Sequence, residues 1–242
     1  MSRNRAAKAQ KRMYQETNTI DFSLARPSPK RIELVPRSIN QESLVLALQD
    51  KAQHIVVTVG PAGTGKTYLA MLAAVKALKE GQCDRLVMTR PAVGVEGEQH
   101  GFLPGNIIAK MEPWTRPLLD VMREYYRAQD ILAMFEDQVV EIAPLAYMRG
   151  RTFKNSWIIA DEMQNATPAQ AKMLMTRIGS NSKIVVTGDV EQADRHSGQN
   201  GLLDLVQRLQ ATPVNGIAVC AMTSRDIQRH SIIGSVLKLY AD

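Results

Sequence analysis

Short apolar runs of four or five residues, rich in Val and Ile, alternate along most of the chain with stretches in which apolar residues recur at helical spacing. Because connections of helix length separate these runs, we expect an α/β domain whose mainly parallel sheet is covered by helices on both faces. The predicted strands are Ile55–Val59, Arg85–Thr89, Val139–Ala143, Trp157–Ala160, Lys183–Thr187 and Ile217–Cys220. The predicted helices are Lys66–Lys79, a region around Ile107–Arg127, Asp130–Asp137, Pro168–Ile178, Leu202–Leu209 and Arg229–Tyr240.

The region before the first strand follows a different pattern. The N-terminal residues lack apolar periodicity, which predicts a flexible arm, and prolines interrupt Thr19–Arg37, which predicts extended segments packed on the domain. Ser38–Asp50 predicts a short helix capped by Ser38 or Asn40. The boundaries predicted in this way are residues 1–18 for the arm and 19–242 for a single domain.

Composition supports a folded domain. The 242 residues are 45% hydrophobic and 22% charged, which excludes a wholly disordered or fibrous chain. No apolar stretch approaches the ~20 residues that span a bilayer, and the N-terminus lacks the apolar segment of a secretory signal. We therefore expect a soluble, cytoplasmic protein with no membrane partner, in which Cys83 and Cys220 are reduced and buried.

The net charge of +6 is concentrated in residues 1–37, which carry nine Lys and Arg against three acids, whereas the rest of the chain is balanced. A cationic arm gains affinity for nucleic-acid phosphates by displacing counterions, without reading sequence. The composition is equally consistent with a solvated tail that aids solubility.

A glycine-rich segment after the strand Ile55–Val59 matches G-x-x-x-x-G-K-[ST] and precedes a helix, which is the setting that a phosphate-binding P-loop requires. Inward-facing backbone N–H groups and the helix N-terminus bind polyphosphate there. Lys66 is expected to reach the β- and γ-phosphates, and the Thr67 hydroxyl to ligate Mg²⁺. The residues expected to hold the nucleotide are Gly60, Pro61, Ala62, Gly63, Thr64, Gly65, Lys66, Thr67 and Tyr68.

Two acids, Asp161 and Glu162, end the strand Trp157–Ala160. We expect the first carboxylate to fix Mg²⁺ through its water shell and the second to orient or deprotonate an attacking water. The pair therefore indicates hydrolysis. In the alternative interpretation, Glu162 only caps the helix Pro168–Ile178 or pairs at the surface.

A third strand, Lys183–Thr187, is followed by Gly188-Asp189-Val190-Glu191-Gln192. Asp189 and Gln192 are candidates for sensing the γ-phosphate. This pattern is also compatible with an ordinary turn at a strand end.

In this order, the three elements resemble the PhoH family of ATPases, relatives of the motor domain of superfamily I helicases. The resemblance implies a RecA-like P-loop fold that uses ATP and Mg²⁺, and it extends over about residues 38–240. Its most specific segments are GFLPG at 101–105 and APLAYMRGRT at 143–152. The remaining matching segments are Asn40-Gln41, residues 60–70, 89–93, 161–165, 176–179, 187–189 with Gln192, 200–202 and 229–230.

The same resemblance implies roles for individual residues. Gln41 is similar to the glutamine that reads the adenine edge in such ATPases. Thr89 and Arg90 fall where motif Ia of the helicases contacts the nucleic-acid backbone. Asp161, Glu162 and Gln164 resemble motif II, and Gly188, Asp189 and Gln192 resemble motif III, which couples phosphate state to nucleic-acid binding.

Hydrolysis in these folds usually needs a further cation that stabilises the transferred phosphoryl group. The length suits one motor domain, so we expect a neighbouring subunit to supply an arginine in trans, in a head-to-tail ring for which six subunits is the family-based expectation. The candidates for the trans arginine are Arg149, Arg151, Arg177, Arg225 and Arg229. Arg90, Arg149, Arg151 and Arg229 are candidates for either role, that of a trans arginine or that of a nucleic-acid contact.

These observations favour a Mg²⁺-dependent ATP hydrolase that acts as an oligomeric translocase or helicase on RNA or single-stranded DNA. The alternative is a nucleotide-gated scaffold that binds nucleic acid or protein, with slow ATP hydrolysis and no unwinding. A small-molecule kinase is disfavoured, because such enzymes place a hydroxyl acceptor and need no catalytic glutamate such as Glu162 beside the metal-binding aspartate.

Overall fold

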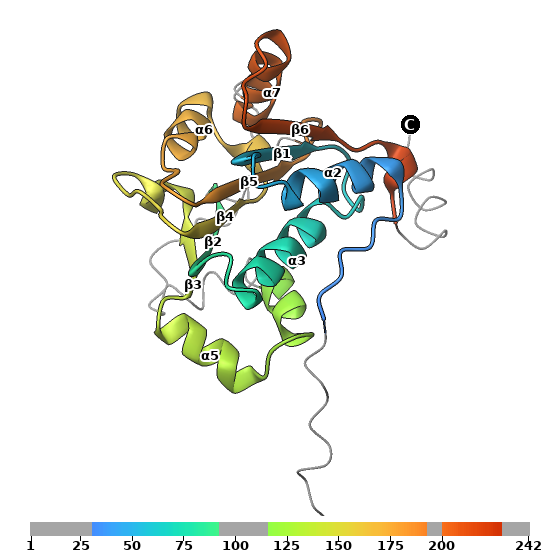
Figure 1. Cartoon of the computed structure of the whole chain (residues 1–242). Coiled ribbons are helices and arrows are strands. Elements are labelled where there is room, and N and C mark those ends of the chain that lie inside the picture. The colour runs from blue at the N-terminus through green and yellow to red at the C-terminus, as the bar shows by residue number, and fades with distance from the viewer. Residues whose placement is uncertain (1–30, 92–115, 193–199, 229–242) are drawn as a thin grey trace, which may run out of the picture. The chain divides into compact units, whose positions relative to one another are not determined.

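A computed structural model describes residues 31–91, 116–192 and 200–228. In this part of the chain, six strands form one sheet in the order β3-β2-β4-β5-β1-β6, and every neighbouring pair is parallel (Figure 1). The predicted parallel α/β architecture is therefore confirmed. The strands are β1 (Ile55–Val59), β2 (Arg85–Arg90), β3 (Val140–Pro144), β4 (Ser156–Ala160), β5 (Lys183–Gly188) and β6 (Ile217–Ala221).

The chain divides into two units, residues 1–31 and 32–242. Except for Arg31, the first unit lies outside the described residues, and so do the predicted arm and its boundary after residue 18. The helix predicted at Arg229–Tyr240 and the first part of the one predicted around Ile107–Arg127 lie outside them as well. The fold given below is that of the second unit.

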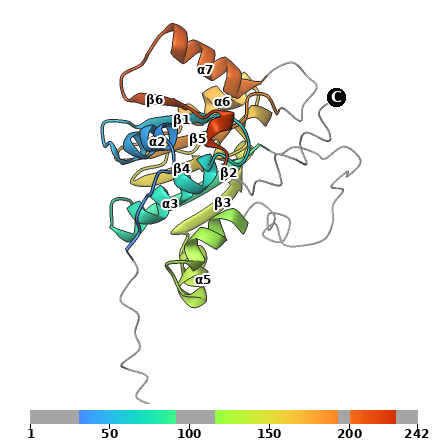
Figure 2. The same cartoon turned by 90° about the vertical axis from the view of Figure 1, so that its right-hand side faces the viewer.

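Helices cover both faces of the sheet: α2, α3 and α5 lie on one face, and α6 and α7 lie on the other (Figures 1 and 2). Residues 116–123 are also helical and pack on the same side as α3. None of the described helices is long and apolar enough to cross a membrane. The helix bounds are α2 (Ile39–Gln49), α3 (Lys66–Lys79), α5 (Ala128–Glu136), α6 (Pro168–Met175) and α7 (Gly201–Ala211).

The core consists of two apolar clusters, one on each face of the sheet. Alternate residues of a strand enter opposite clusters, as Val56 and Val57 of β1 show. Every residue of β1, β4 and β5 is buried, because parallel strands in the middle of a sheet are covered on both sides. The outermost strand, β6, exposes Val219. Continuous apolar runs therefore mark the central strands, and all six predicted strands agree with the observed bounds to within one residue.

Helix ends differ more from the predictions than strand ends do. The helix predicted to reach Ile178 ends at Met175, because Ile178 pairs with Phe153 in a parallel bridge and the carbonyl of Arg177 accepts a hydrogen bond from the Phe153 N–H at 3.0 Å. At the start of α2, Ser38 is the capping residue, and its hydroxyl accepts from the Gln41 N–H. The other candidate cap, Asn40, has a different partner, described below.

Lys183, at the start of β5, connects the sheet to the end of α2. Its buried ammonium group donates to the carbonyl oxygens of Ala47, Leu48 and Asp50 at 3.3, 2.7 and 2.8 Å. The ring of Trp157 lies 5.3 Å from the same group. Burial lowers the pKa of Lys183 to about 8 and the charge of Asp50 opposes this shift, so the ammonium form still prevails at pH 7. The lysine thus supplies donors to carbonyls that the end of a helix leaves unpaired.

We expect Lys183→Met to lower the free energy of unfolding by about 1–3 kcal/mol, because buried carbonyls of α2 lose their donors. Urea denaturation at pH 7, followed by circular dichroism, measures the change. The matched control is Lys172→Met on the exposed side of α6, which should change stability by less than about 0.5 kcal/mol. Equal losses in the two variants would contradict a specific role for the Lys183 contacts.

Candidate nucleotide-binding site

Residues 60–65 join β1 to α3 and form the turn that the P-loop motif predicts. Gly60 has a φ of 139°, and a Cβ at this position would lie 2.4 Å from the carbonyl oxygen of Met222. Gly65 precedes α3 with a φ of 81°. Both conformations favour glycine, which lets the backbone turn tightly over the end of β1. The first N–H groups of α3, free of helical partners, therefore face the turn and suit an anion.

Lys66, the first residue of α3, is buried within the P-loop. Its Nζ donates to the carbonyl oxygens of Gly60 at 2.5 Å and Pro61 at 2.7 Å. Burial lowers the pKa of Lys66, and three nearby carboxylates oppose that shift, namely those of Asp189, Glu162 and Asp161. The P-loop thus holds the ammonium group of Lys66 through hydrogen bonds to two neutral carbonyl oxygens. A phosphate oxygen can take the place of these carbonyls as the acceptor.

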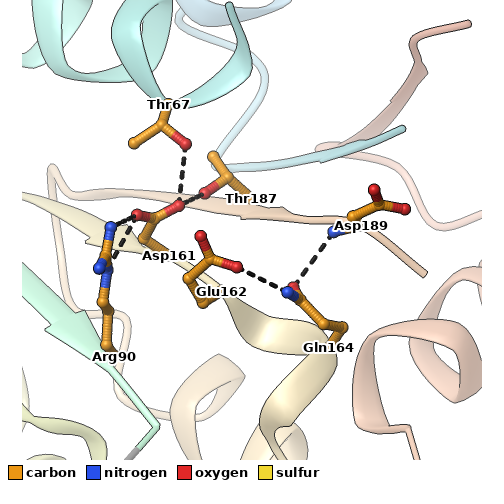
Figure 3. Close-up of polar contacts among 7 residues, drawn as sticks. All are labelled: Thr67, Arg90, Asp161, Glu162, Gln164, Thr187 and Asp189. Atoms are coloured by element: carbon orange, nitrogen blue, oxygen red, sulfur yellow. Dashed lines mark hydrogen bonds and ion pairs between the residues drawn. The ribbon is translucent and has the colours of Figure 1, made fainter. Parts of the chain in front are cut away.

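Asp161, directly after β4, is only 2% exposed and receives hydrogen bonds from three elements (Figure 3). Its Oδ1 accepts from the hydroxyls of Thr67, at 2.9 Å, and Thr187. Its Oδ2 accepts from Arg90, whose Nε lies 3.0 Å away and whose Nη2 completes an ion pair. Sequence analysis did not anticipate the contacts of Thr187 and Arg90. The signal was available only in the strand order, since β2 and β5 both flank β4.

The residues present fit Mg²⁺. Thr67 and Asp161 supply a hydroxyl and a carboxylate in hydrogen-bond contact, and oxygen donors of this kind are what Mg²⁺ prefers. Within the described residues, no group of three or more His, Cys, Asp or Glu is arranged to hold a metal by itself. A magnesium ion here would therefore complete its shell with phosphate oxygens and water, as it usually does in nucleotide sites.

Glu162 and the strand end of β5 are linked by the amide of Gln164 (Figure 3). The Gln164 Nε2 donates to a Glu162 carboxylate oxygen at 2.6 Å, and its Oε1 accepts from the Asp189 N–H at 3.1 Å. Glu162 itself adopts a left-handed conformation, with a φ of 56°. Strained residues of this kind persist only where neighbouring contacts hold them, and they concentrate at functional sites. Gln164 is one of the contacts that hold Glu162.

The alternative in which Glu162 caps the following helix is wrong. Thr167 is the N-cap of α6: its hydroxyl accepts from the Gln170 N–H, and the Gln170 side chain accepts from the Thr167 N–H. Glu162 is therefore not needed for the start of α6, and its carboxylate remains exposed at the site.

One cavity of about 270 Å³ brings the three predicted motifs together. It opens at the carboxyl edge of the sheet, where open α/β sheets bind ligands. Thr64 is fully buried and does not line the cavity, and its hydroxyl donates to the Pro61 carbonyl of the loop at 2.9 Å. The lining residues are Ala62, Gly63, Gly65, Lys66, Thr67, Tyr68, Asp161, Glu162, Gly188, Asp189 and Gln192.

Gln41 lies beside the P-loop, but the protein backbone already uses both ends of its amide. Its Nε2 donates to the Thr64 carbonyl at 3.0 Å, and its Oε1 accepts from the Arg37 N–H at 2.8 Å. With 3% exposure, Gln41 supports the P-loop in this structure. A second cavity of about 610 Å³ adjoins it, lined by Gln41, Gly63, Gly65, Tyr68 and Gln228 among others.

The candidate arginines fall into two groups. Arg90, Arg151 and Arg177 are occupied within the chain: Arg90 by Asp161, Arg151 by both carboxylate oxygens of Glu141, and Arg177 by backbone carbonyls. Arg149 and Arg225 are exposed. Arg229 lies outside the described residues.

Fold and site together define a RecA-like P-loop NTPase fold. β5 lies between β1, which ends in the P-loop, and β4, which ends in Asp161, so the carboxyl edge of the sheet carries all three motifs. The predicted fold class is confirmed.

The chain belongs to the PhoH family, since residues 33–241 match the family model described as PhoH-like protein. It is 42% identical over 212 residues to a PhoH-like protein of Synechocystis, 42% over 205 residues to one of Bacillus subtilis, and 38% over 199 residues to protein PhoH of Escherichia coli. These alignments cover 87%, 84% and 81% of this chain, and 63%, 63% and 55% of the relatives. The chain thus spans less than two thirds of the length of these relatives.

Among solved structures, the chain is similar to the Hef helicase domain of Pyrococcus furiosus, with a TM-score of 0.43, and to the SWI2/SNF2 ATPase core of Sulfolobus solfataricus in complex with dsDNA, with a TM-score of 0.47. Sequence identity is 14% in both cases. The similarity covers 77% and 81% of this chain, and 39% and 46% of those chains.

We expect Arg90→Gln to lower the free energy of unfolding of the ligand-free protein by about 1.5–3 kcal/mol, because the buried Asp161 loses its cation. Mg²⁺ with ADP should recover more stability in this variant than in the wild type, since the metal can neutralise the same carboxylate. Urea denaturation with and without Mg²⁺ and ADP measures both effects. Arg127→Gln, which removes an exposed ion pair with Asp130, is the control and should cost much less; equal losses would contradict the role of Arg90.

Proposed function

We propose that this chain binds ATP with Mg²⁺ at the P-loop and hydrolyses it. The observation that carries the proposal is the single cavity in which Lys66 and Thr67 face Asp161 and Glu162. A phosphate-binding turn alone would be compatible with binding, but an exposed carboxylate next to the metal-binding aspartate adds the group that hydrolysis requires.

Each residue has a defined task in this proposal. Lys66 leaves the loop carbonyls and pairs with the β- and γ-phosphates, and Thr67 and Asp161 hold Mg²⁺. When bound, the metal neutralises phosphate charge during transfer. Glu162, held by Gln164, orients the attacking water or accepts its proton. Asp189 and Gln192 line the cavity from the β5 side and sense the γ-phosphate.

We further propose that the protein forms an oligomer in the cytoplasm. In this oligomer it uses ATP hydrolysis to act on RNA or single-stranded DNA. The resemblance to helicase motifs and the basic arm support nucleic acid as the partner. In this proposal the oligomer is a ring, six-membered by the family-based expectation, in which a neighbour supplies an arginine. Of the described candidates, Arg149 and Arg225 suit this role, because both are exposed whereas Arg90 and Arg151 are paired with carboxylates of their own chain.

Lys66→Ala is expected to weaken ATP binding and abolish turnover, because the phosphates lose their central cation. Glu162→Gln should bind ATP with near wild-type affinity but lower the rate of hydrolysis by about 10²-fold or more, because the water loses its base. Phosphate release with Mg²⁺ and equilibrium binding of a fluorescent ATP analogue separate the two effects. Normal hydrolysis by both variants would refute this site.

The same assay tests the nucleic-acid and oligomer proposals when it is repeated with single-stranded RNA or DNA and over a range of protein concentrations. Stimulation by nucleic acid, with specific activity that rises with protein concentration, supports an oligomeric motor. Slow turnover that responds to neither favours the nucleotide-gated scaffold.

Deletion of residues 2–15 is expected to lower nucleic-acid affinity and to flatten its salt dependence, because five Lys and Arg are lost. If all five cations contact phosphates of a single strand, the magnitude of the slope of log affinity against log salt concentration decreases by up to about 3.5. Fluorescence anisotropy at several salt concentrations measures the slope, and basal ATP hydrolysis serves as the control and should not change. A chain with the five cations replaced by Gln separates charge from length. An unchanged slope in both variants would leave the arm as a solubility tail.

A further inference from the structure

Residues 222–228, here called the strap, follow β6 and contact the P-loop at its start and at Gly63. The Met222 N–H donates to the Val59 carbonyl at 2.7 Å, and Met222 lies so close to Gly60 that a side chain there would collide with it. The Gln228 N–H donates to the Gly63 carbonyl at 2.9 Å. The strap thus holds the backbone of the phosphate-binding turn from one side.

Helix α2 holds the adjacent peptide unit of the same turn. The Gln41 side chain donates to the Thr64 carbonyl at 3.0 Å, so two consecutive carbonyls, those of Gly63 and Thr64, have partners from different parts of the chain. The N–H groups that would face phosphate belong to the same peptide units, and their direction follows from the direction of the carbonyls. The relative position of α2 and the strap therefore affects how the turn presents its N–H groups.

Asp226 connects these two parts directly. It lies in the strap and is only 2% exposed. Its Oδ2 accepts from the Asn40 side chain at 2.8 Å, and from the N–H and hydroxyl of Thr223 at 2.6 and 3.0 Å. Burial works against its ionisation, but hydrogen bonds from Asn40, Ser38 and Thr223 outweigh burial and lower the pKa of Asp226 to about 2. The group is thus a carboxylate at neutral pH, although it lies outside the cavity that holds the three motifs.

We propose that Asp226 is a positioning residue for nucleotide binding, which acts by joining α2 to the strap and so fixing the P-loop from both sides. This inference rests on the proposed binding of nucleotide at the P-loop. All three groups that face the Oδ2 atom are donors, so an acceptor is required at this point, and the negative charge strengthens each bond. The hydrogen bond joins residues 186 positions apart and connects the strap to α2.

Asp226→Asn tests the inference through affinity, measured by titration of a fluorescent ADP analogue in the presence of Mg²⁺. We expect the Kd to rise on the order of tenfold, within the usual range of coupling between sites. Asn40→Ala removes the same connection from α2 and should raise the Kd as well.

A control separates positioning from general stability. Ser182→Ala removes buried hydrogen bonds to the Phe153 carbonyl, at 2.9 Å, and from the Ser156 N–H, at 3.0 Å, at the opposite edge of the sheet. This variant should lower the thermal unfolding temperature but leave the Kd unchanged. Equal changes of Kd in Ser182→Ala and Asp226→Asn would overturn the inference.

Lys66→Ala distinguishes failure of the inference from failure of the proposed function. If Lys66→Ala weakens ADP binding while Asp226→Asn and Asn40→Ala bind as the wild type does, nucleotide binding at the P-loop stands and the role of Asp226 is refuted. If Lys66→Ala binds ADP as tightly as the wild type, the P-loop is not the binding site and both proposals fail.

Discussion

The arrangement of the site depends on the hydrogen bonds and the ion pair that one buried carboxylate, that of Asp161, receives. A charge with so little exposure is costly unless partners replace the lost water, and here two hydroxyls and a guanidinium do so. The partners come from α3, β2 and β5, and they are Thr67, Arg90 and Thr187. These elements must therefore lie around the end of β4 before Asp161 is satisfied, which makes the strand order a condition for the chemistry.

A parallel sheet provides this condition because all its strands end at the same edge. The P-loop, the two acids and the β5 end then meet in one cavity without long insertions. Two glutamine side chains support the residues around this cavity. Gln164 donates a hydrogen bond to Glu162, which has a left-handed backbone conformation, and Gln41 donates one to the Thr64 carbonyl. Glu162, to which the proposed function assigns the attacking water, is thus oriented by a neighbour with no chemical task of its own.

Local patterns predicted most of the fold. Central strands such as β4 are apolar throughout because both of their faces are covered, and α3 has the composition and spacing of a helix that follows a P-loop. The prediction failed where a distant partner decided the local structure. Ile178 has helical spacing relative to α6, yet it pairs with Phe153, and Glu162 was open to a capping role that Thr167 occupies.

The sequence by itself determined which residues the proposed function assigns to phosphate, metal and water, because the P-loop motif, Asp161 and Glu162 are recognisable from residue type and short-range spacing. It also determined the element order, since periodicity is a local property. Only the tertiary structure decided the partners of Arg90, Lys183 and Asp226, which lie 71 to 186 positions away along the chain. Such contacts depend on which strands are neighbours and which helix covers which face, and the spacing between residues in a sequence does not encode that arrangement.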